Sequence, residues 1–469
     1  MKRWSSLSTV KTVSDLVERA KVAQKIVEGY SQRKLDELAA AIVYTLSRYE
    51  VAQEIAKFAV VETDMGDEES KIKKLTKKMP AVFYQVKSVK TVGVIERDLE
   101  MGIRKIAKPV GIIAALVPST NSEATPVFKG VLSLRARNAI IFAPHPRSKN
   151  TTKKVVDIMR DILEKNGAPK DLFICVETPS KEISQELMTQ CDLTMATGSG
   201  DMVKAAYSSG KPAYGVGAGN AVVVIDETAN LADAAEKIRI GKLGDLASGC
   251  SAENSLVIKE SVYNEMIDLL KTEGGYLVNQ EEKEKLKDTM WVDGHLSREI
   301  VAKPASRIAE AAGFSIPNKA KFIMVEESGI GQGYPFSGEK MSVVVTIYKY
   351  NEFDEAIEKV NKITAYSGYG HSCGIHSNND EHIMQLALNT KTTKVIVRQP
   401  HGMANSGAWF NGLANTFSLG CGTWGGNIVS ENVTQKHYMN TTWVAEPIDR
   451  REASEEEIFG DLIKNAVLI

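Results

Sequence analysis

The sequence predicts an α/β protein built from two parallel sheets that are covered by helices. Three observations predict this class. Short apolar runs rich in Val, Ile and Ala lack polar alternation, helical stretches separate these runs, and Gly, Pro and Asn bound them. Strands of this kind are buried on both faces, as in a parallel sheet between two helical layers. With 469 residues, the chain has room for two or three domains.

The first sixty residues predict amphipathic helices. From about Thr12 to Thr63, apolar residues recur at intervals of three and four among many charged ones, which is the period of a helix with one buried face. The basic run Lys71-Ile-Lys-Lys-Leu-Thr-Lys-Lys78 follows. Such a run usually forms the solvated face of a helix, so we expect no function for it.

Two sets of strands follow, each interleaved with helical stretches. Ligands of parallel sheets bind beyond the carboxyl ends of the strands, so the segments after the first strands are candidates for a binding site. The first set comprises the apolar runs 110–117, 139–143, 171–176, 192–196 and 221–225. In the second set, helices at 232–240, 261–272 and 297–312 precede strands at 322–325, 343–348 and 394–397. We place the boundary between the sets near residues 226–232, and expect the acidic stretch that starts at Glu452 to begin a surface helix.

The composition excludes several classes of function. Lys and Arg total 58 against 59 Asp and Glu, so no global charge attracts nucleic acid or an anionic membrane. No apolar run approaches the roughly 18 residues of a membrane span, and no apolar run follows the basic N-terminus as in a secretory signal. The five cysteines are scattered and the seven histidines have no helical pairing. We therefore expect a cytoplasmic protein with reduced thiols and no metal.

Two glycine-rich segments are candidates for ligand contact. Ala196-Thr-Gly-Ser-Gly200 follows a strand and precedes a helix, so its amides would face a phosphate or ribose at a helix N-terminus. It departs from the G-x-G-x-x-G fingerprint, and a plain turn explains it equally well. Gly215-Val-Gly-Ala-Gly-Asn220 carries three alternate glycines, which let backbone approach a flat ligand or simply form a tight turn.

Cys250 is the cysteine with a chemical rationale. It lies in Ser248-Gly-Cys-Ser-Ala252, where small neighbours leave room for a carbonyl group to reach the sulfur. A thiolate there would attack an aldehyde and form a hemithioacetal. Free cysteines are more often inert core residues, and this alternative stays open on composition alone. The other four cysteines are interpreted as structural.

Several long motifs together resemble the aldehyde dehydrogenase superfamily, and in particular its branch that acylates coenzyme A. The resemblance spans roughly residues 12 to 445 and keeps the family's order of motifs. It implies an aldehyde dehydrogenase-like fold of two Rossmann-like α/β domains with an oligomerisation arm. The motifs are Pro109-Val-Gly-Ile-Ile-Ala-Ala-Leu-Val-Pro-Ser-Thr-Asn121, Ala143-Pro-His-Pro-Arg147, the segment 203–220, Leu419-Gly-Cys-Gly-Thr-Trp-Gly-Gly-Asn427 and Ser430-Glu-Asn-Val433.

The resemblance implies roles for individual residues. Cys250 takes the place of the nucleophile, and Asn121 that of the amide which stabilises the developing oxyanion together with the backbone N–H of Cys250. His371 matches a histidine of the family's site, although a structural histidine fits equally well. His145 matches the contact to the adenosine ribose, and Glu339 the carboxylate on the nicotinamide ribose. The full set of implied nucleotide contacts is Ser119, Thr120, His145, Arg147, Gly198, Ser199, Gly215, Gly217 and Glu339.

One departure from the wider superfamily bears on the product. Hydrolytic members carry Glu-Leu-Gly-Gly where this chain reads Gly215-Val-Gly-Ala218, so the glutamate that activates water is absent. A thiol with a pKa of about 8.5 supplies some thiolate at neutral pH without such a base. Both the chemistry and the resemblance therefore favour coenzyme A as the acyl acceptor.

Within this branch, the chain is most similar to enzymes for sulfoacetaldehyde and succinate semialdehyde. We favour sulfoacetaldehyde, with succinate semialdehyde or another short aldehyde as the alternative. The implied contacts to the anionic end of the substrate are Arg398, His401 and Asn405, with Ser406 beside them. Arg398 also fits a surface ion pair equally well. NADP is favoured modestly over NAD, because Arg147 or Lys149 would bind a 2′-phosphate if they do not face solvent.

The resemblance also divides the chain. Residues 1–228 would form the nucleotide-binding domain, 229–418 the catalytic domain with Cys250, and 419–469 the oligomerisation arm and the C-terminal tail. We therefore expect a homodimer or homotetramer that binds a small anionic aldehyde and coenzyme A, with no nucleic acid or membrane partner.

Overall fold

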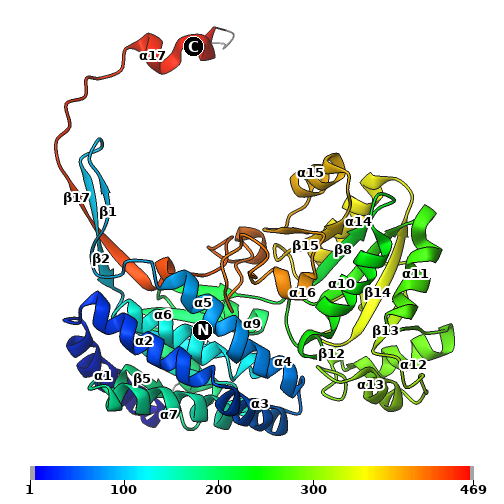
Figure 1. Ribbon diagram of the computed structural model, residues 1–469, viewed down its shortest axis with the longest axis horizontal. Coiled ribbons are helices and arrows are strands. Elements are labelled where there is room, and N and C mark those ends of the chain that lie inside the picture. Colours follow the sequence, from blue (N-terminus) through cyan, green and yellow to red (C-terminus); the bar gives the residue numbers. More distant parts are fainter. Residues whose placement is uncertain (1–5, 465–469) are drawn as a thin grey trace.

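The computed structural model describes residues 6–464 and consists of two α/β bodies and a projecting arm (Figure 1). The first body, blue to green, contains a five-stranded parallel sheet, and the second, green to orange, contains a seven-stranded parallel sheet. Helices cover both sheets. The predicted α/β class with two Rossmann-like bodies is confirmed.

The sheet of the first body has the order β5-β4-β3-β6-β7. Four of its strands are predicted apolar runs, β7 was not predicted, and the predicted run 221–225 lies in the other sheet. Their bounds are β3 (Ile112–Val117), β4 (Ala139–Pro144), β5 (Phe173–Cys175), β6 (Leu193–Thr197) and β7 (Ala213–Val216). The helices that connect them are α6 (Thr125–Arg135), α7 (Lys149–Lys165), α8 (Lys181–Gln190) and α9 (Gly200–Tyr207).

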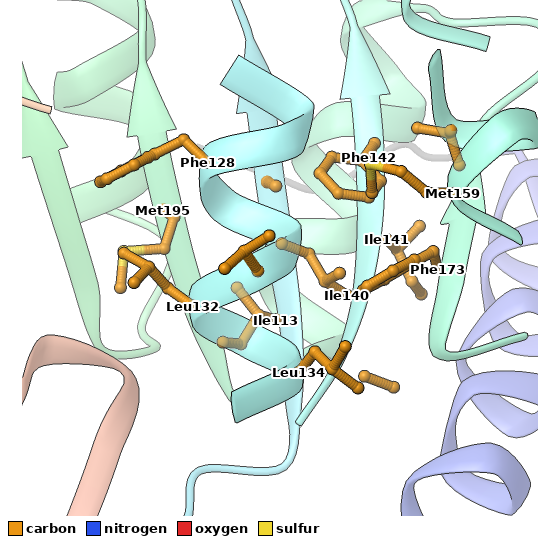
Figure 2. Packing of buried hydrophobic residues seen from close by; sticks show 14 of the residues in the cluster. Ile113, Phe128, Leu132, Leu134, Ile140, Ile141, Phe142, Met159, Phe173 and Met195 are labelled. Carbon is orange, nitrogen blue, oxygen red and sulfur yellow. The ribbon is translucent and has the colours of Figure 1, made fainter. Parts of the chain in front are cut away.

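The core of this body lies between α6 and the sheet. Figure 2 shows Phe128 and Leu132 of α6 among Ile113 of β3 and Ile140 of β4, and all four side chains are fully buried. Burying a side chain of this size contributes roughly 1.5–3 kcal/mol. The absence of polar alternation in β3 and β4 follows directly, since helices cover both faces.

The N-terminal helices pack against this body. They are α1 (Leu7–Val27), α2 (Gln32–Leu46) and α3 (Tyr49–Thr63). Ser6 and Ser31 cap the first two by accepting hydrogen bonds from backbone N–H groups. Their buried residues follow the predicted spacing, as Val13, Val17 and Ala20 do in α1. The prediction of amphipathic helices is therefore confirmed.

The basic run 71–78 differs from the prediction. Helix α4 (Glu68–Lys73), a π-helical turn η1 (Lys74–Lys78) and α5 (Met79–Val86) follow one another without a break. The expectation of a solvated face is wrong for Lys71, which is 1% exposed, and for the half-buried Lys74 and Lys78. Their spacing places these three on one helix face, which meets carboxylate and carbonyl oxygens of other segments.

The second sheet has the order β10-β13-β14-β9-β8-β15-β16. The expected boundary at residue 228 is wrong by one strand, because β8 lies in this sheet between β9 and β15 and not in the first one. The apolar run alone carries no sign of which sheet it joins. The strands are β8 (Ala221–Ile225), β9 (Glu253–Lys259), β10 (Gly275–Leu277), β13 (Phe322–Glu326), β14 (Val344–Tyr350), β15 (Cys373–His376) and β16 (Val395–Val397).

Helices cover the second sheet, and a short hairpin of β11 (Trp291–Val292) and β12 (His295–Leu296) lies beside it. The predicted helix 297–312 is shorter in the structure and begins after Pro304, because the proline ring disfavours a helical conformation of the preceding residue. The helices are α10 (Leu231–Leu243), α11 (Tyr263–Thr272), α12 (Gln280–Met290), α13 (Ala305–Ala311), α14 (Phe353–Tyr366), α15 (Asp380–Asn389) and α16 (His401–Ala404).

The connection between the sheets positions the candidate site. Strand β7 ends at Val216 and β8 begins at Ala221, so residues 217–220 lead from one sheet directly into the other. The carboxyl end of β7 is thereby joined to the amino end of β8. As the strands of each sheet are parallel, the carboxyl edge of the first sheet and the amino edge of the second lie at the junction of the two bodies.

The arm is a three-stranded antiparallel sheet of β1 (Gly93–Asp98), β2 (Ile103–Pro109) and β17 (Met439–Ala445). Figure 1 shows it extending away from both bodies, with the C-terminal tail beyond it. The predicted acidic helix is present as α17 (Glu455–Phe459), and its capping box pairs Ser454 with Glu457.

No helix within residues 6–464 has the length and apolar character to cross a membrane. All five cysteines are free thiols.

Candidate active site

Cys250 lies at the amino edge of the second sheet, three residues before β9. Gly219, in the link between the sheets, packs directly against it. A Cβ atom at position 219 would lie 2.0 Å from the carbonyl oxygen of Cys250 and 3.0 Å from its Cβ. Only glycine therefore fits this close approach of the two backbones, which gives the glycine-rich segment 215–220 a structural reason.

His371 is the nearest basic group to the sulfur. Its Nε2 lies 3.3 Å from Cys250 Sγ, and its Nδ1 lies 2.8 Å from Ser372 Oγ. Asn405 Nδ2 donates to both Ser372 Oγ and Ser251 Oγ at 3.0 Å. These hydrogen bonds connect the imidazole ring of His371 with Ser251, the residue after Cys250.

The electrostatics of the pair favour neutral groups. Burial raises the pKa of the Cys250 thiol to about 12, with a smaller contribution from the carboxylate of Glu339. Burial, followed by the positive charge of Lys394, lowers the pKa of His371 to about 3. The resting pair is therefore a thiol beside a neutral imidazole rather than a thiolate–imidazolium ion pair.

The turn before Cys250 has an unusual backbone. Asp245, Leu246 and Ala247 have φ values of 48°, 50° and 58°, and each non-glycine residue in this region costs roughly 1–2 kcal/mol. The Asp245 carboxylate stabilises the turn, since it accepts from Ser248 Oγ at 2.7 Å and from the backbone N–H of Asp67 at 3.0 Å. The approach to the nucleophile is thus anchored to the N-terminal helices.

Asn121 lies after β3, in the short helical turn Ser119–Asn121. Its Oδ1 accepts a hydrogen bond from Lys74 Nζ at 2.6 Å, and Lys74 also contacts Asp245. The amide is therefore tied, through one lysine, to the turn that ends at Cys250.

The carboxyl edge of the first sheet gathers the predicted nucleotide contacts. Ser119 and Thr120 follow β3, His145 follows β4, and Gly198 and Ser199 follow β6. Ser199 caps α9 by accepting from the N–H of Met202 at 3.4 Å.

The histidine at this edge keeps one free nitrogen. His145 Nδ1 accepts from the N–H of Arg147 at 3.2 Å, which leaves Nε2 for a ligand. Arg147 makes a long contact of 3.4 Å to the carbonyl of Thr63. Burial, and then Arg147, lowers the pKa of His145, so the ring is neutral.

Glu339, the predicted contact to the nicotinamide ribose, lies beside the link between the two sheets. Its Oε1 accepts from the N–H of Gly219 at 3.2 Å, and no other protein donor within residues 6–464 reaches the carboxylate. Burial raises its pKa to about 7. A half-buried carboxylate with free lone pairs fits the hydroxyl groups of a ribose. Gly217 fits as well, since a Cβ there would meet no atom within 4 Å and the space beside it is open.

Gly215 is placed differently from the other predicted contacts. It is a buried residue of β7 that packs against α9, where a Cβ would lie 2.6 Å from Val203 Cγ1 and 2.9 Å from Tyr207 Cε2. Its N–H donates to the Tyr207 hydroxyl at 3.0 Å. The residues of α9 thus fill the space of a side chain at position 215, and this glycine faces the protein rather than a ligand.

Of the three predicted substrate contacts, two support the nucleophile from within the protein. Asn405 is fully buried and His401 is 1% exposed. Asn405 makes the contacts to Ser372 and Ser251 given above. His401 Nδ1 lies 2.7 Å from the carbonyl oxygen of Ser251. Both side chains are therefore buried beside Ser251, the residue after Cys250, and neither is exposed at the protein surface.

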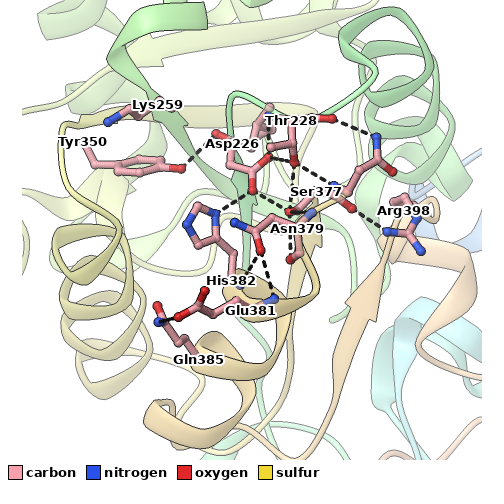
Figure 3. A network of polar contacts seen from close by, with 12 residues as sticks. Asp226, Thr228, Lys259, Tyr350, Ser377, Asn379, Glu381, His382, Gln385 and Arg398 are labelled. Atoms are coloured by element: carbon pink, nitrogen blue, oxygen red, sulfur yellow. Dashed lines mark hydrogen bonds and ion pairs between the residues drawn. The ribbon is translucent and has the colours of Figure 1, made fainter.

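Arg398 lies at the other edge of the sheet. It follows the carboxyl end of β16, whereas Cys250 and His371 precede β9 and β15. Its guanidinium donates to the carbonyl of Ser377 at 2.5 Å, beside the Asp226 network (Figure 3). These contacts do not support the expected contact with the substrate. The side chain is exposed, but within residues 6–464 it binds a backbone carbonyl and forms no ion pair, so the surface ion pair offered as the alternative is not found either.

The sequence analysis missed three residues that adjoin this site. Lys74 and Asp245 are described above, and Lys394 precedes β16 at the same edge as Cys250, with Nζ donating to the carbonyl of Gly420 at 3.1 Å. The spacing of Lys71, Lys74 and Lys78 on one helix face was the signal that could have revealed the first.

Comparison with known proteins agrees with this geometry. The sequence model of the aldehyde dehydrogenase family matches residues 4–286. The acylating sulfoacetaldehyde dehydrogenase of Bilophila wadsworthia is 44% identical over 460 residues, which cover 97% of this chain and 99% of that protein. The acetylating succinate-semialdehyde dehydrogenase of Clostridium kluyveri is 38% identical, with coverage of 97% and 100%.

Solved structures are similar over the same length. The acetylating aldehyde dehydrogenase of Geobacillus thermoglucosidasius superposes with a TM-score of 0.92 at 38% identity, covering 96% of this chain and 99% of that one. The Rhodopseudomonas palustris propionaldehyde dehydrogenase with bound propionyl-CoA gives 0.82 at 25% identity, with coverage of 94% and 97%. An engineered glycolyl-CoA reductase with bound NADP+ gives 0.83 at 26%, with coverage of 92% and 96%. The chain therefore belongs to the aldehyde dehydrogenase family, within its acylating branch.

Proposed function

We propose that this protein converts sulfoacetaldehyde, coenzyme A and NADP+ into sulfoacetyl-CoA, NADPH and a proton. The observation that carries the proposal is the 3.3 Å contact between Cys250 Sγ and His371 Nε2. A second observation supports the proposal. Val203 and Tyr207 pack against Gly215 and leave no room at this position for a carboxylate that would activate water. A nucleophile with a base, but without a means to activate water, suits transfer of the acyl group to a thiol.

In the first half of the reaction, Cys250 Sγ bonds to the aldehyde carbon and its proton passes to His371 Nε2. His371 accepts this proton when its Nδ1–H donates to Ser372 Oγ. The carbonyl oxygen gains negative charge, which the backbone N–H of Cys250 and the Asn121 amide stabilise. The charges on imidazolium and oxyanion arise together, so the buried site never holds an isolated charge.

Bound NADP+ would supply the hydride acceptor for the former aldehyde carbon. Glu339 would hold the nicotinamide ribose from one side, while His145, Gly198 and Ser199 would hold the adenosine end from the other. Arg147, at the carboxyl edge of β4, would pair with a 2′-phosphate. The NADP-bound relative described above supports this cofactor.

Before the second half, His371 releases the first proton to solvent, and this is the proton among the products. The thiol of coenzyme A then attacks the thioester carbon and His371 takes its proton. The bond between the acyl carbon and Cys250 Sγ breaks, and His371 returns this second proton to the sulfur. The relative with bound propionyl-CoA supports coenzyme A as the acceptor.

The choice of aldehyde is supported by the relatives rather than by a contact in the site. Three curated relatives at 39–44% identity are named for sulfoacetaldehyde, against 38% for the succinate-semialdehyde enzyme. The deciding assay measures CoA-dependent NADP+ reduction with sulfoacetaldehyde, succinate semialdehyde, acetaldehyde and propionaldehyde. We expect the highest kcat/KM with sulfoacetaldehyde. A higher value with succinate semialdehyde would instead favour the alternative, and formation of NADPH without CoA would contradict acyl transfer to the thiol.

The arm supports a homo-oligomer, either a dimer or a tetramer. Leu99 at its tip is 88% exposed and Trp443 in β17 is 58% exposed, and exposed apolar side chains of this size commonly mark contact surfaces. The free thiols support a reducing compartment such as the cytoplasm. Sedimentation of the purified protein would measure the oligomeric state.

A further inference from the structure

Four charged side chains form a buried cluster beside the turn that precedes Cys250. They are Lys71, Lys74, Glu123 and Asp245. Glu123 is fully buried, and Lys71 and Asp245 are 1% and 3% exposed. Lys71 Nζ lies 3.0 Å from Asp245 Oδ2, Lys74 Nζ contacts the same oxygen, and Lys74 lies 3.5 Å from Glu123 Oε1. The cluster thus contains two positive and two negative side chains, so it carries no net charge in this largely buried position.

Stability alone is a weak reason for such a cluster. Desolvation of buried ions largely offsets their attraction, and apolar residues of similar volume often hold a fold together equally well. The cluster instead joins three segments that meet at the candidate site. These are the helical segment 68–86, the turn after β3 that carries Asn121, and the turn 245–247 that leads to Cys250.

Lys74 has a specific effect on Asn121. An ammonium group only donates hydrogen bonds, so the amide atom 2.6 Å from Lys74 Nζ is the oxygen, Oδ1. The Nδ2 group of Asn121 therefore points away from Lys74, and it has no partner among residues 6–464. Without the lysine, the amide could rotate its oxygen toward the substrate, where it would repel a developing oxyanion.

Lys74 also stays charged in this position. Burial opposes its charge, but Asp245 and Glu123 outweigh burial and raise the pKa of Lys74. A permanent cation on the amide oxygen draws electron density from the amide and strengthens its N–H groups as donors.

We propose that Lys74 is a positioning residue for the oxyanion site: it holds the Asn121 amide with Nδ2 toward the aldehyde oxygen, and its contact with Asp245 keeps that amide in register with Cys250. The inference rests on the proposed roles of Cys250 and Asn121. Lys74 itself does not touch the reacting atoms and acts through Asn121.

The test is the burst of 4-nitrophenolate released from 4-nitrophenyl acetate. Cys250 Sγ bonds to the acetyl carbon, 4-nitrophenolate leaves, and the thiol proton goes to His371, so neither nucleotide nor a sulfonate takes part. We expect Lys74→Met to lower the burst rate constant about 10- to 100-fold, a large part of what loss of an oxyanion donor costs. Alkylation of Cys250 by iodoacetamide forms no oxyanion and should keep its wild-type rate.

The controls separate positioning from folding. Lys77→Met changes an exposed lysine of the same helical segment and should leave the burst unchanged. Lys74→Arg keeps the donor and the charge and should recover most of the rate. Lys74→Met/Glu123→Gln removes one charge of each sign from the cluster, and this variant decides the result if Lys74→Met does not fold.

A double-mutant cycle with Asn121→Ala gives the decisive comparison. If Lys74 acts through Asn121, Lys74→Met will slow the burst of the Asn121→Ala variant by less than about twofold. Equal slowing in both backgrounds overturns the inference, and so does a wild-type burst in a folded Lys74 variant. A wild-type burst in Asn121→Ala alone would contradict the proposed oxyanion site itself, which is a distinguishable failure.

Discussion

The Nε2 atom of His371 lies 3.3 Å from the sulfur of Cys250, and burial holds both groups neutral. A buried neutral pair differs from the ion pairs of cysteine enzymes whose thiolate is preformed. Reactivity then depends on proton transfer during attack and not on a standing thiolate.

The neutral pair predicts the pH dependence of alkylation. A Cys250 thiol with a pKa of about 12 gains thiolate as pH rises, so its alkylation by iodoacetamide should accelerate about tenfold per pH unit between roughly pH 6 and pH 9. Mass spectrometry of the Cys250 peptide in the ligand-free protein measures the rate. A plateau in this range would indicate a thiolate–imidazolium pair instead.

Gly219→Ala should abolish most activity. Its methyl group would lie 2.0 Å from the Cys250 carbonyl oxygen, so one of the two backbones must move. A displacement of about 1 Å at a nucleophile costs on the order of 100-fold in kcat/KM. Gly244→Ala is the matched control, since no atom lies within 4 Å of its Cβ. Comparable activity in the two variants would contradict the close packing.

Gly215→Glu should not create a hydrolytic enzyme. The new side chain would collide with Val203 and Tyr207, and overpacking of this kind typically costs about 1–3 kcal/mol. We expect a lower melting temperature and no release of free acid in the absence of CoA, measured by chromatography. Appearance of CoA-independent acid would show that position 215 reaches the acyl group after all.

Arg398→Ala should leave kcat/KM for sulfoacetaldehyde unchanged. The side chain follows the carboxyl end of β16 and binds the carbonyl of Ser377, at the edge of the sheet opposite to Cys250 (Figure 3). Steady-state kinetics with sulfoacetaldehyde and acetaldehyde provide the check. Selective loss of activity toward sulfoacetaldehyde would restore Arg398 as an anion contact.

The sequence predicted the parts of the fold that local patterns determine. The amphipathic α1–α3 follow from periodicity, the buried β3 and β4 from continuous apolar runs, and α17 from the acidic stretch at Glu452. The sheet membership of β8 does not, because the apolar run 221–225 is equally suited to either sheet. Only its pairing with β9 and β15 distinguishes them.

The candidate site divides in a similar way. The resemblance of sequence motifs identified Cys250, His371, Asn121 and Glu339 as candidate site residues, because each lies in or near a motif that can be read directly from the sequence. It did not reveal the partners that come from distant segments, such as Lys74 for Asn121, which are 47 residues apart. Proximity in sequence was also a poor guide: Arg398 and Asn405 are only seven residues apart, but Arg398 contacts Ser377 after the carboxyl end of β15, whereas Asn405 contacts Ser251 before the amino end of β9.

The four residues between β7 and β8 set a limit on how far the two bodies can move apart. Four extended residues span about 14 Å at most, and both flanking strands are fixed in their sheets. The N–H of Gly219 in this tether donates to Glu339, and a Cβ at position 219 would meet the backbone of Cys250. A wide opening of the junction would therefore have to pull on the residues that contact both Glu339 and Cys250, so the chain confines any hinge motion to small displacements at this point.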